Sequence, residues 1–314
     1  MLHLQLRVPE PLTDRVVDLL THDETVTNVA VFPGGYAKPP GALVLADVAR
    51  EGANPVVAEL RHLGLHHDGS IMLSEPATIL SDATVAAEQA APGDPDDGVV
   101  WDIVENRVRT ESKLTWSYCS FLTLATLIAG TGRLLDQVIL IIGAMVVGPE
   151  FSPVAAICVA LARPRLTLLP HAARTLVLGF AVAILVAAPL WFVGRLIGLV
   201  DPHDVASGTQ TAFIISPDVW SFVIALLAGV AGVLSLTTSK SGPLVGVFIS
   251  VTTVPAVGTI ALCIGAGVWS EVTGAAIQLG VNILGMVMAG SLTLLTQRTI
   301  WSRIQSSRKA GALH

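Results

Sequence analysis

The residues best suited to chemistry lie in one apolar stretch, which reads Gly148-Pro-Glu-Phe-Ser-Pro153. Each proline removes a backbone N–H donor, and its ring clashes with the preceding turn, so Pro149 and Pro153 should interrupt a helix. Carbonyl groups freed inside a membrane need protein or water partners. An acid such as Glu150 at the bilayer centre costs about 3 kcal/mol on insertion scales and usually faces a cavity or a partner. This combination predicts an ion or proton site.

A second interruption is expected at Ser250-Val-Thr-Thr-Val-Pro255. Pro255 opens the helix there, and the two threonine hydroxyls can coordinate a polar ligand without a charge. Farther along the chain, Gln278 and Asn282 lie four residues apart, so they share one face of a helix. We therefore predict a substrate- or ion-binding site formed by Glu150, Ser152, Thr252, Thr253 and Asn282, with Pro149, Pro153 and Pro255 as helix breakers.

A structural interpretation is available for the same residues. Glu150 can cap amide groups exposed by a kink, or it can reach the cytoplasmic interface. Gln278 and Asn282 can simply join helices through hydrogen bonds worth about 0.6 kcal/mol each. The hydroxyl residues around Lys240 are typical of a cytoplasmic turn with a helix cap.

Other motifs point more weakly to function. His62, His66, His67 and Asp68 form a cluster, but Gly64 interrupts it and no cysteine stands nearby, so we expect solvent-facing histidines and no metal. The turn Gly34-Gly-Tyr-Ala-Lys38 lacks the strand and helix of a phosphate loop, although it can serve as a ligand loop. Without a nucleophile elbow, a His-Glu zinc motif or an acid-base pair, we predict neither an enzyme nor a cofactor.

The amino-acid composition predicts that these sites lie in a membrane protein. Of 314 residues, 52% are hydrophobic and 13% are charged, whereas about a quarter are charged in globular domains. Most acids precede residue 114, and later stretches lack charge altogether. No basic, aromatic-studded patch predicts nucleic-acid binding. The cysteines all fall in apolar runs and predict no disulfide framework: Cys119, Cys158 and Cys263.

Apolar runs long enough to cross the hydrocarbon core, about 20 residues each, predict six spans. They lie near Thr115–Thr131, Leu135–Leu161, Ala172–Leu199, Val219–Leu236, Leu244–Val268 and Val272–Leu295. We expect an α-helical polytopic membrane protein with its transmembrane domain at 115–298 and a tail at 299–314.

Flanking charges predict the orientation. Basic residues gather at alternate span ends: Arg107, Arg109, Lys113, Arg163, Arg165, Arg174, Lys240, Arg298, Arg303, Arg308 and Lys309. The opposite ends carry Arg133, Asp136, Arg195, Asp201, Asp204, Asp218 and Glu271. By the positive-inside rule both termini are cytoplasmic. The first residues lack the basic flank and apolar core of a secretory signal, which also favours a cytoplasmic N-terminus in a bacterial or archaeal plasma membrane.

The two halves of this domain share a pattern. Trp116-Ser117 recurs as Trp220-Ser221, Gly143 corresponds to Gly246, and Pro153 corresponds to Pro255, at separations of 104, 103 and 102 residues. Each half has three predicted crossings, so the second copy must enter the membrane from the opposite side. This 3+3 inverted repeat is the plan of many secondary transporters.

The same residues carry a family resemblance. Gly143-Ala-Met-Val-Val-Gly-Pro-Glu-Phe-Ser-Pro153 and Ala160-Leu-Ala-Arg-Pro-Arg165 resemble the DUF389 family of bacterial and archaeal membrane proteins, as do Leu234–Gly242 and Val251–Pro255. The resemblance runs from about Val99 to Gln297 and implies a membrane topology without a known function. Many members have a small hydrophobic residue where this chain has Glu150, which implies that any role of this acid belongs to a subset.

A soluble domain is predicted before the spans. Alternation predicts strands at Leu2–Val8, Val26–Phe32, Ala42–Val48 and Ser70–Leu73, and helical spacing predicts helices at Pro11–Leu20 and Asn54–Leu63. This β-α-β-β-α-β order predicts a ferredoxin-like domain at 1–75. Residues 76–98 read as a linker, and 99–114 as an amphipathic helix that lies on the membrane face or packs on the soluble domain.

Three functions follow from these patterns. The inverted repeat and interrupted helices favour an ion-coupled secondary transporter of a small solute or ion. A homo-oligomeric channel would line its pore with the same interruptions, and a membrane sensor would bind a cytoplasmic ligand with the N-terminal domain. Glycines at Gly280, Gly285 and Gly290 allow close helix contacts within or between subunits, and we predict a homo-oligomer.

Overall fold

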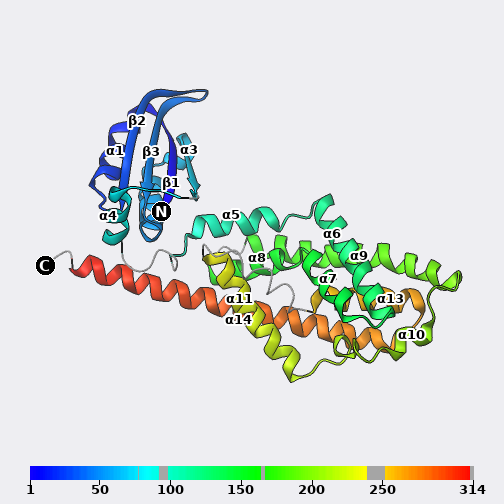
Figure 1. Ribbon diagram of the computed structural model, residues 1–314. Coiled ribbons are helices and arrows are strands. Elements are labelled where there is room, and N and C mark those ends of the chain that lie inside the picture. The colour runs from blue at the N-terminus through cyan, green and yellow to red at the C-terminus, as the bar shows by residue number, and fades with distance from the viewer. Residues whose placement is uncertain (77, 92–97, 164–166, 239–251, 312–314) are drawn as a thin grey trace. The chain divides into compact units, whose positions relative to one another are not determined.

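The chain is described by a computed structural model of two compact units (Figure 1). It covers residues 1–76, 78–91, 98–163, 167–238 and 252–311, with side chains up to residue 300. One unit comprises Met1–Val104 and Trp301–His314, and the other comprises Glu105–Ile300.

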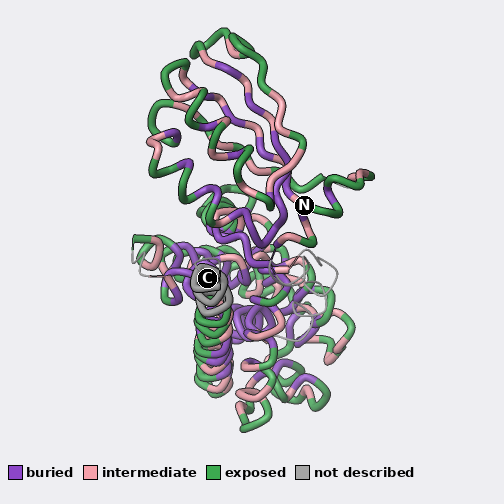
Figure 2. The backbone as a smooth tube through the Cα atoms, turned by 90° about the vertical axis from the view of Figure 1, so that its left-hand side faces the viewer, coloured by how far each residue is buried: buried purple, intermediate pink, exposed green. Residues whose placement is uncertain are grey.

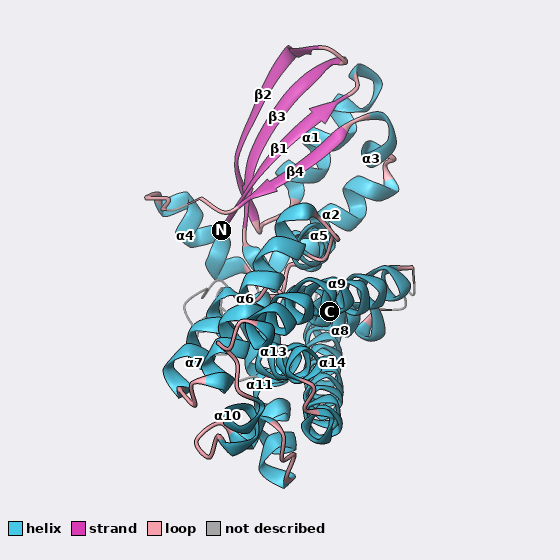
Figure 3. Ribbon diagram, turned by 90° about the vertical axis from the view of Figure 1, so that its right-hand side faces the viewer, coloured by secondary structure: helices cyan, strands magenta, loops and turns pink. Residues whose placement is uncertain are grey.

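The first unit contains a four-stranded antiparallel sheet (Figure 3). Its strands are β1 (Leu2–Val8), β2 (Val26–Ala37), β3 (Pro40–Val48) and β4 (Ser70–Ser74), in the order β2-β3-β1-β4. In β1 the burial alternates, with Leu2, Leu4, Leu6 and Val8 fully buried. The period-2 pattern of the sequence therefore places one face of the sheet in the core.

Helices cover this buried face. The helices of this part are α1 (Thr13–His22), α2 (Ala53–His62) and the short α3 (Leu65–Asp68), which follows Gly64 in the left-handed conformation at φ 80°. Val16 and Leu20 of α1 and Val56 and Leu60 of α2 join the strand residues in one core. The succession β-α-β-β-α-β is therefore the one that the sequence predicts.

The segment after β4 adds to this core. It contains α4 (Asp82–Ala90), inside the stretch predicted as a linker, and the start of α5 (Trp101–Glu111). Val100 is 1% exposed within the core, and Ile103 packs against it. The side-chain amide of Asn54 donates to the carbonyl oxygen of Val99 at 2.7 Å. Of the two interpretations of the 99–114 helix, packing on the soluble domain thus describes its first turn.

These contacts predict that residues 1–104 form a more stable fragment than residues 1–75. Burial of one valine side chain contributes about 1.5–3 kcal/mol, and Asn54 would lose its partner in the shorter fragment. Both fragments should show mixed α/β circular dichroism, and the longer one should unfold at the higher urea concentration. Equal transition midpoints would show that the segment from 76 onward contributes nothing to this fold.

The second unit is a set of apolar helices. They are α6 (Trp116–Leu134), α7 (Val138–Val147), α8 (Phe151–Ala162), α9 (Leu168–Leu196), α10 (Pro202–Ser207), α11 (Val219–Thr237), α13 (Thr253–Ala266) and most of α14 (Trp269–Gly311). Three of them, namely α9, α11 and the Trp269–Ile300 part of α14, are long and apolar enough to cross a membrane. The pairs α5–α6 and α7–α8 are bent by 72° and 56°, and up to five spans result if each pair is one span.

The surface of this unit suits lipid better than water. Helix α9 exposes Leu185 at 72% and Leu196 at 69%, while Leu176 on the same helix is 5% exposed. Figure 2 shows exposed and buried stretches side by side along the chain. Rows of exposed leucines on a helix of this length are unfavourable in water and normal in hydrocarbon. The apolar helices therefore indicate a membrane protein, and the number of crossings stays a prediction.

Glycines bring α11 and α14 close together. A methyl group on Gly229 would lie 2.6 Å from the carbonyl oxygen of Met286, and one on Gly285 would lie 2.7 Å from Cβ of Ala225. A methyl group on Gly290 would lie 2.8 Å from Sγ of Cys158, whereas Gly280 has open space around it. Two of the three predicted contact glycines therefore pack within the chain, and the homo-oligomer stays a prediction.

Candidate functional site

The chain breaks between α7 and α8 at Gly148-Pro149-Glu150. Helix α7 ends at Val147, and α8 begins at Phe151 after Glu150, which is 4% exposed. Pro153 is the third residue of α8, and Pro255 is likewise the third residue of α13. The first turn of a helix has N–H groups without intrahelical partners, so a proline costs little there. These two prolines thus stand at helix starts, and Pro149 stands in the break itself.

The two predicted interruptions meet at a buried hydrogen bond. The hydroxyl of Thr253 donates to Oε1 of Glu150 at 2.8 Å, across 103 residues of sequence. Thr253 is completely buried, and Oε2 of Glu150 has no hydrogen-bond partner within the described part of the chain. A methyl group on Gly148 would overlap this oxygen and lie 2.6 Å from Cγ2 of Val254. The break before α8 therefore contacts the start of α13 directly.

Thr252 joins this site to α14. Nδ2 of Asn282 donates to Oγ1 of Thr252 at 2.7 Å, and Nε2 of Gln278 donates to the same atom at 3.1 Å. Gln278 also approaches Oδ1 of Asn282 at 3.4 Å, and both amides are 2% exposed. Thr252, Gln278 and Asn282 thus form one hydrogen-bonded cluster. Gln278 was expected on the same helix face as Asn282 but was not among the predicted binding residues.

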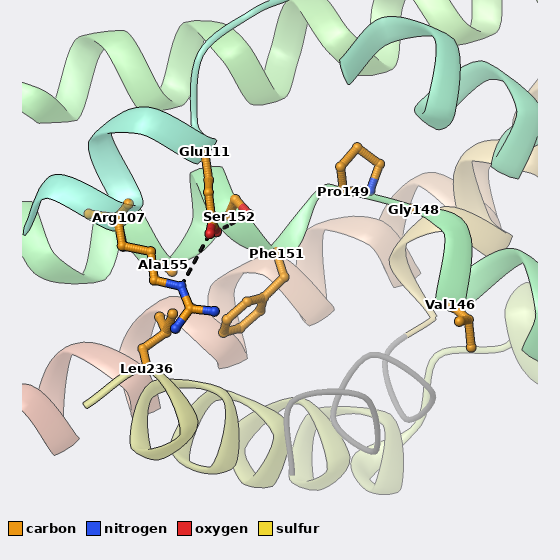
Figure 4. A pocket seen from close by; sticks show the side chains of 10 residues that line it. Arg107, Glu111, Val146, Gly148, Pro149, Phe151, Ser152, Ala155 and Leu236 are labelled. Carbon is orange, nitrogen blue, oxygen red and sulfur yellow. Dashed lines mark hydrogen bonds and ion pairs between the residues drawn. The ribbon is translucent and has the colours of Figure 1, made fainter. Parts of the chain in front are cut away.

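Ser152 lies elsewhere. Its hydroxyl donates to Oε2 of Glu111 at 3.2 Å, and Glu111 also pairs with Arg107 (Figure 4). These three side chains face a cavity of about 250 Å³ that Gly148, Pro149 and Leu236 also line. Of the five predicted binding residues, four thus contact one another in pairs, and Ser152 faces this separate cavity.

A second cavity, also of about 250 Å³, lies at the other end of α11. It is lined by Phe213, Asp218, Trp220, Ser221, Ile224, Ala225, Thr252, Gln278 and Asn282. Leu236 near the C-terminal end of α11 lines the first cavity, and Asp218 at its N-terminal end lines the second. Gly148, which lines the first cavity, is two residues before Glu150. Thr252, which lines the second cavity, directly precedes Thr253. The buried contact between Glu150 and Thr253 therefore lies near both cavities in sequence.

Arg133 forms a buried polar cluster that the sequence analysis treats only as loop charge. It is 0% exposed, and its Nη2 donates to Oε2 of Glu271 at 2.8 Å. Its Nη1 donates to Oγ1 of Thr211 at 2.8 Å and to the carbonyl oxygen of Gly208 at 3.0 Å. In the sequence, Arg133 is one of two arginines, with Arg195, among the acids at these span ends.

Asp136 anchors the same loop. Its carboxylate accepts backbone N–H groups of Thr209, Gln210 and Thr211 at 2.9–3.1 Å, and the Thr211 hydroxyl at 2.8 Å. These hydrogen bonds, the one from Gln210 foremost, hold the pKa of the Asp136 carboxyl below its usual range. The segment between the two halves is therefore tied to the end of α6.

Several sequence predictions fall outside this geometry. Three predicted features lie outside the described residues, namely the turn around Lys240, the repeat position Gly246, and Ser250 at the start of the second interruption. Among those described, no group of three or more histidine, cysteine, aspartate or glutamate side chains is placed to hold a metal ion. His66 and His67 are exposed, and their rings contact each other in a tilted arrangement with centroids 3.8 Å apart.

Comparison with known proteins supports the family resemblance over part of the chain. Residues 145–288 match the family model described as a domain of unknown function, DUF389. An uncharacterized protein of the archaeon Methanocaldococcus jannaschii is 29% identical over 168 residues, which are 52% of this chain and 49% of the relative. The chain thus spans about half the length of that relative. No solved structure matches this chain. The resemblance seen in the residues is confirmed over residues 145–288, a segment similar to the DUF389 family that includes Glu150, Thr253 and Asn282.

Proposed function

We propose that this protein is an ion-coupled secondary transporter of a small solute or ion, with Glu150 as the coupling site. One observation carries the proposal: a buried carboxylate lies where two interrupted segments meet, with one oxygen bound by Thr253 and the other without a partner among the described residues. Leaving a buried acceptor unsatisfied costs about 1–3 kcal/mol, and more when it is charged. A proton or a small cation on Oε2 would remove that cost.

Helix starts support an exchangeable ligand at this place. The N-terminal ends of α8 and α13 carry the positive end of the helix dipole. They stabilise the Glu150 carboxylate when the ion has left. Half-helix ends that meet inside a membrane domain are the arrangement with which many secondary transporters bind ions. The site can therefore exist in both a loaded and an empty form.

Access from two sides supports transport over a fixed structural role. Cavities of about 250 Å³ lie at opposite ends of α11, and each is lined by a residue next to or near the Glu150–Thr253 contact. Nineteen residues of α-helix are about 28 Å long, close to the thickness of the hydrocarbon core. Such a closed contact between two openings suits alternating access, whereas an open pore would suit a channel.

The repeat and the topology belong to the same proposal. Helices α6 and α11 both have 19 residues and both begin at a side-chain N-cap, Thr115 and Asp218. Six crossings with both termini in the cytoplasm agree with the flanking charges. Reporter fusions at Asp204 and at Glu271 read this orientation, because the proposal places both residues outside the cell.

The coupling site is tested with Glu150→Gln, which keeps the size of the side chain and removes its charge. Purified wild type should gain thermal stability in the presence of the coupling ion, by about 2.7 kcal/mol at 100 times its dissociation constant. Melting temperatures are compared in sodium, potassium and lithium chloride and across pH. The Glu150→Gln variant should melt at the same temperature in every salt, and its melting temperature should change less with pH than that of the wild type.

Thr253→Val and Thr259→Val form a matched pair for this experiment. Both threonines are fully buried on α13, but the Thr259 hydroxyl has no hydrogen-bond partner in the described part of the structure. Thr253→Val should weaken the ion response and Thr259→Val should leave it intact. Identical responses of wild type and Glu150→Gln would make Glu150 a structural cap and end the coupling proposal.

A sensor function has one observation in its favour. A cavity of about 610 Å³ in the N-terminal unit is lined by residues of the predicted ligand loop, Gly34 and Tyr36, and by Glu10, Thr13 and Asp14 at the start of α1. A soluble ligand bound there would stabilise the fragment 1–104. Saturable flux of a solute across the membrane, without any soluble ligand that stabilises fragment 1–104, would favour the transporter.

A further inference from the structure

The cavity at the N-terminal end of α11, here called the Asp218 pocket, is large enough for a solute. The pocket has a volume of about 250 Å³, and Thr252, Gln278 and Asn282 line one part of it. A single water needs only about 10–15 Å³ measured by the same kind of probe. The pocket therefore has room for a molecule of several heavy atoms beside the Glu150–Thr253 contact.

Its amide groups leave hydrogen-bond acceptors unused. Both amide nitrogens donate to Oγ1 of Thr252, so the two lone pairs of this oxygen are already used. Oε1 of Gln278 is buried and has no hydrogen-bond partner among the described groups. Buried side-chain oxygens of native proteins are rarely left in this state. A ligand that donates an N–H to Gln278 would satisfy it.

The mouth of the pocket carries negative charge. Asp218 caps α11, and its carboxylate accepts the backbone N–H of Ser221 at 2.8 Å and the Ser221 hydroxyl at 2.9 Å. The N–H bond, followed by the hydroxyl bond, holds the pKa of Asp218 below its usual range, so this residue is ionised at neutral pH. No lysine or arginine stands among the described lining residues. The capping carboxylate also neutralises the positive end of α11, which would otherwise attract anions.

Aromatic rings complete the wall. Phe213 and Trp220 line the pocket together with Ile224. Aromatic faces attract cations and accept apolar stems, so they serve an alkylammonium group well and a carboxylate poorly. Every chemical feature of the pocket thus favours a donor-rich, positively charged ligand.

We propose that the Asp218 pocket binds the ammonium group of a small organic amine, with Oε1 of Gln278 as its hydrogen-bond acceptor and Asp218 as its counter-charge. This inference rests on the proposed transport function and names the class of its solute. The amine would occupy the pocket next to the ion site, so that the ion at Glu150 and the solute at Gln278 share the short segment Thr252-Thr253.

Three near-isosteric probes test the ligand class. The full chain, purified in nanodiscs, is titrated with propylammonium, propionamide and propionate, and binding is followed by calorimetry. Propylammonium should bind, and the other two should bind at least about tenfold more weakly, because charged hydrogen bonds are roughly twice as strong as neutral ones. Equal binding of propionamide, or binding of propionate, would overturn the ammonium assignment.

Gln278→Leu and Gln297→Leu are the matched variants. Gln297 lies on the same helix, donates to Thr237 at 3.0 Å, and also has an Oε1 without a partner in the described structure, but it does not line the pocket. Gln278→Leu should weaken propylammonium binding by about tenfold or more, and Gln297→Leu should not. Asp218→Asn keeps the helix cap and removes the charge, so it should reduce the preference for propylammonium over propionamide even if Gln278→Leu fails to fold.

Glu150→Gln separates this inference from the function on which it rests. The variant should lose its ion response and still bind propylammonium, because the pocket residues are intact. If Gln278→Leu and Asp218→Asn both bind like wild type, the pocket is not the amine site, whatever Glu150 does. If amine binding holds while the ion response of Glu150 fails, the pocket stands and the coupling proposal falls.

Discussion

Replacing Arg133 with methionine is expected to lower the free energy of unfolding by about 3–5 kcal/mol. The guanidinium is fully buried and donates to Glu271, Thr211 and Gly208, while Glu271 is 11% exposed at its side chain. Removal of the arginine leaves the Glu271 carboxylate without its counter-charge in a buried site. The pair also joins the last turn of α6 to the first turn of α14, so its loss should loosen both halves of the membrane unit.

A double-mutant cycle measures this pair. Unfolding in detergent is followed for Arg133→Met, Glu271→Gln and the double variant, and the double variant should be clearly less destabilised than the sum of the single variants. Arg195→Met is the control, because Arg195 is an exposed arginine on the same predicted side of the membrane. A loss below about 1 kcal/mol for Arg133→Met would place this pair with ordinary surface ion pairs.

Gly148→Ala is expected to abolish the ion response while the acid remains in the chain. The backbone at Gly148 has φ −69° and ψ 131°, which alanine adopts freely, so the effect comes from space alone. The added methyl group would overlap Oε2 of Glu150 and press on Val254. The carboxylate must then leave its place beside Thr253, and overpacking of this kind costs about 1–3 kcal/mol.

Gly143→Ala is the matched control for this prediction. Gly143 lies on α7, the helix that ends just before Gly148, and no atom of the described residues stands within 4 Å of a methyl group placed there. The melting temperature of Gly143→Ala should respond to ions as wild type does, and that of Gly148→Ala should be as insensitive as Glu150→Gln. The double variant Gly148→Ala/Glu150→Gln should add no further loss, because both changes act on one site. A normal ion response in Gly148→Ala would show that the position of Glu150 does not matter.

Local patterns in the sequence determined much of this protein. Strand β1 covers the predicted residues Leu2–Val8, and its alternation fixes which side chains enter the core. The sequence marked Gly148–Glu150 and Pro255 as places where helices break or begin. This works locally because proline lacks a backbone N–H and its ring clashes with the preceding turn. The apolar runs and the family resemblance likewise depend only on residues near one another in the chain.

Only the tertiary structure decided which of these residues meet. The Thr253–Glu150 contact spans 103 residues, and nothing local to either residue specifies the other. The burial of Arg133 and the bonds of Gln278 to Thr252 arise in the same way, from the packing of distant helices. On α9, Leu176 is buried and Leu185 is exposed although both are leucine. Lipid is as apolar as a protein core, so hydropathy alone cannot tell the inner face of a membrane helix from its outer face, and packing has to decide.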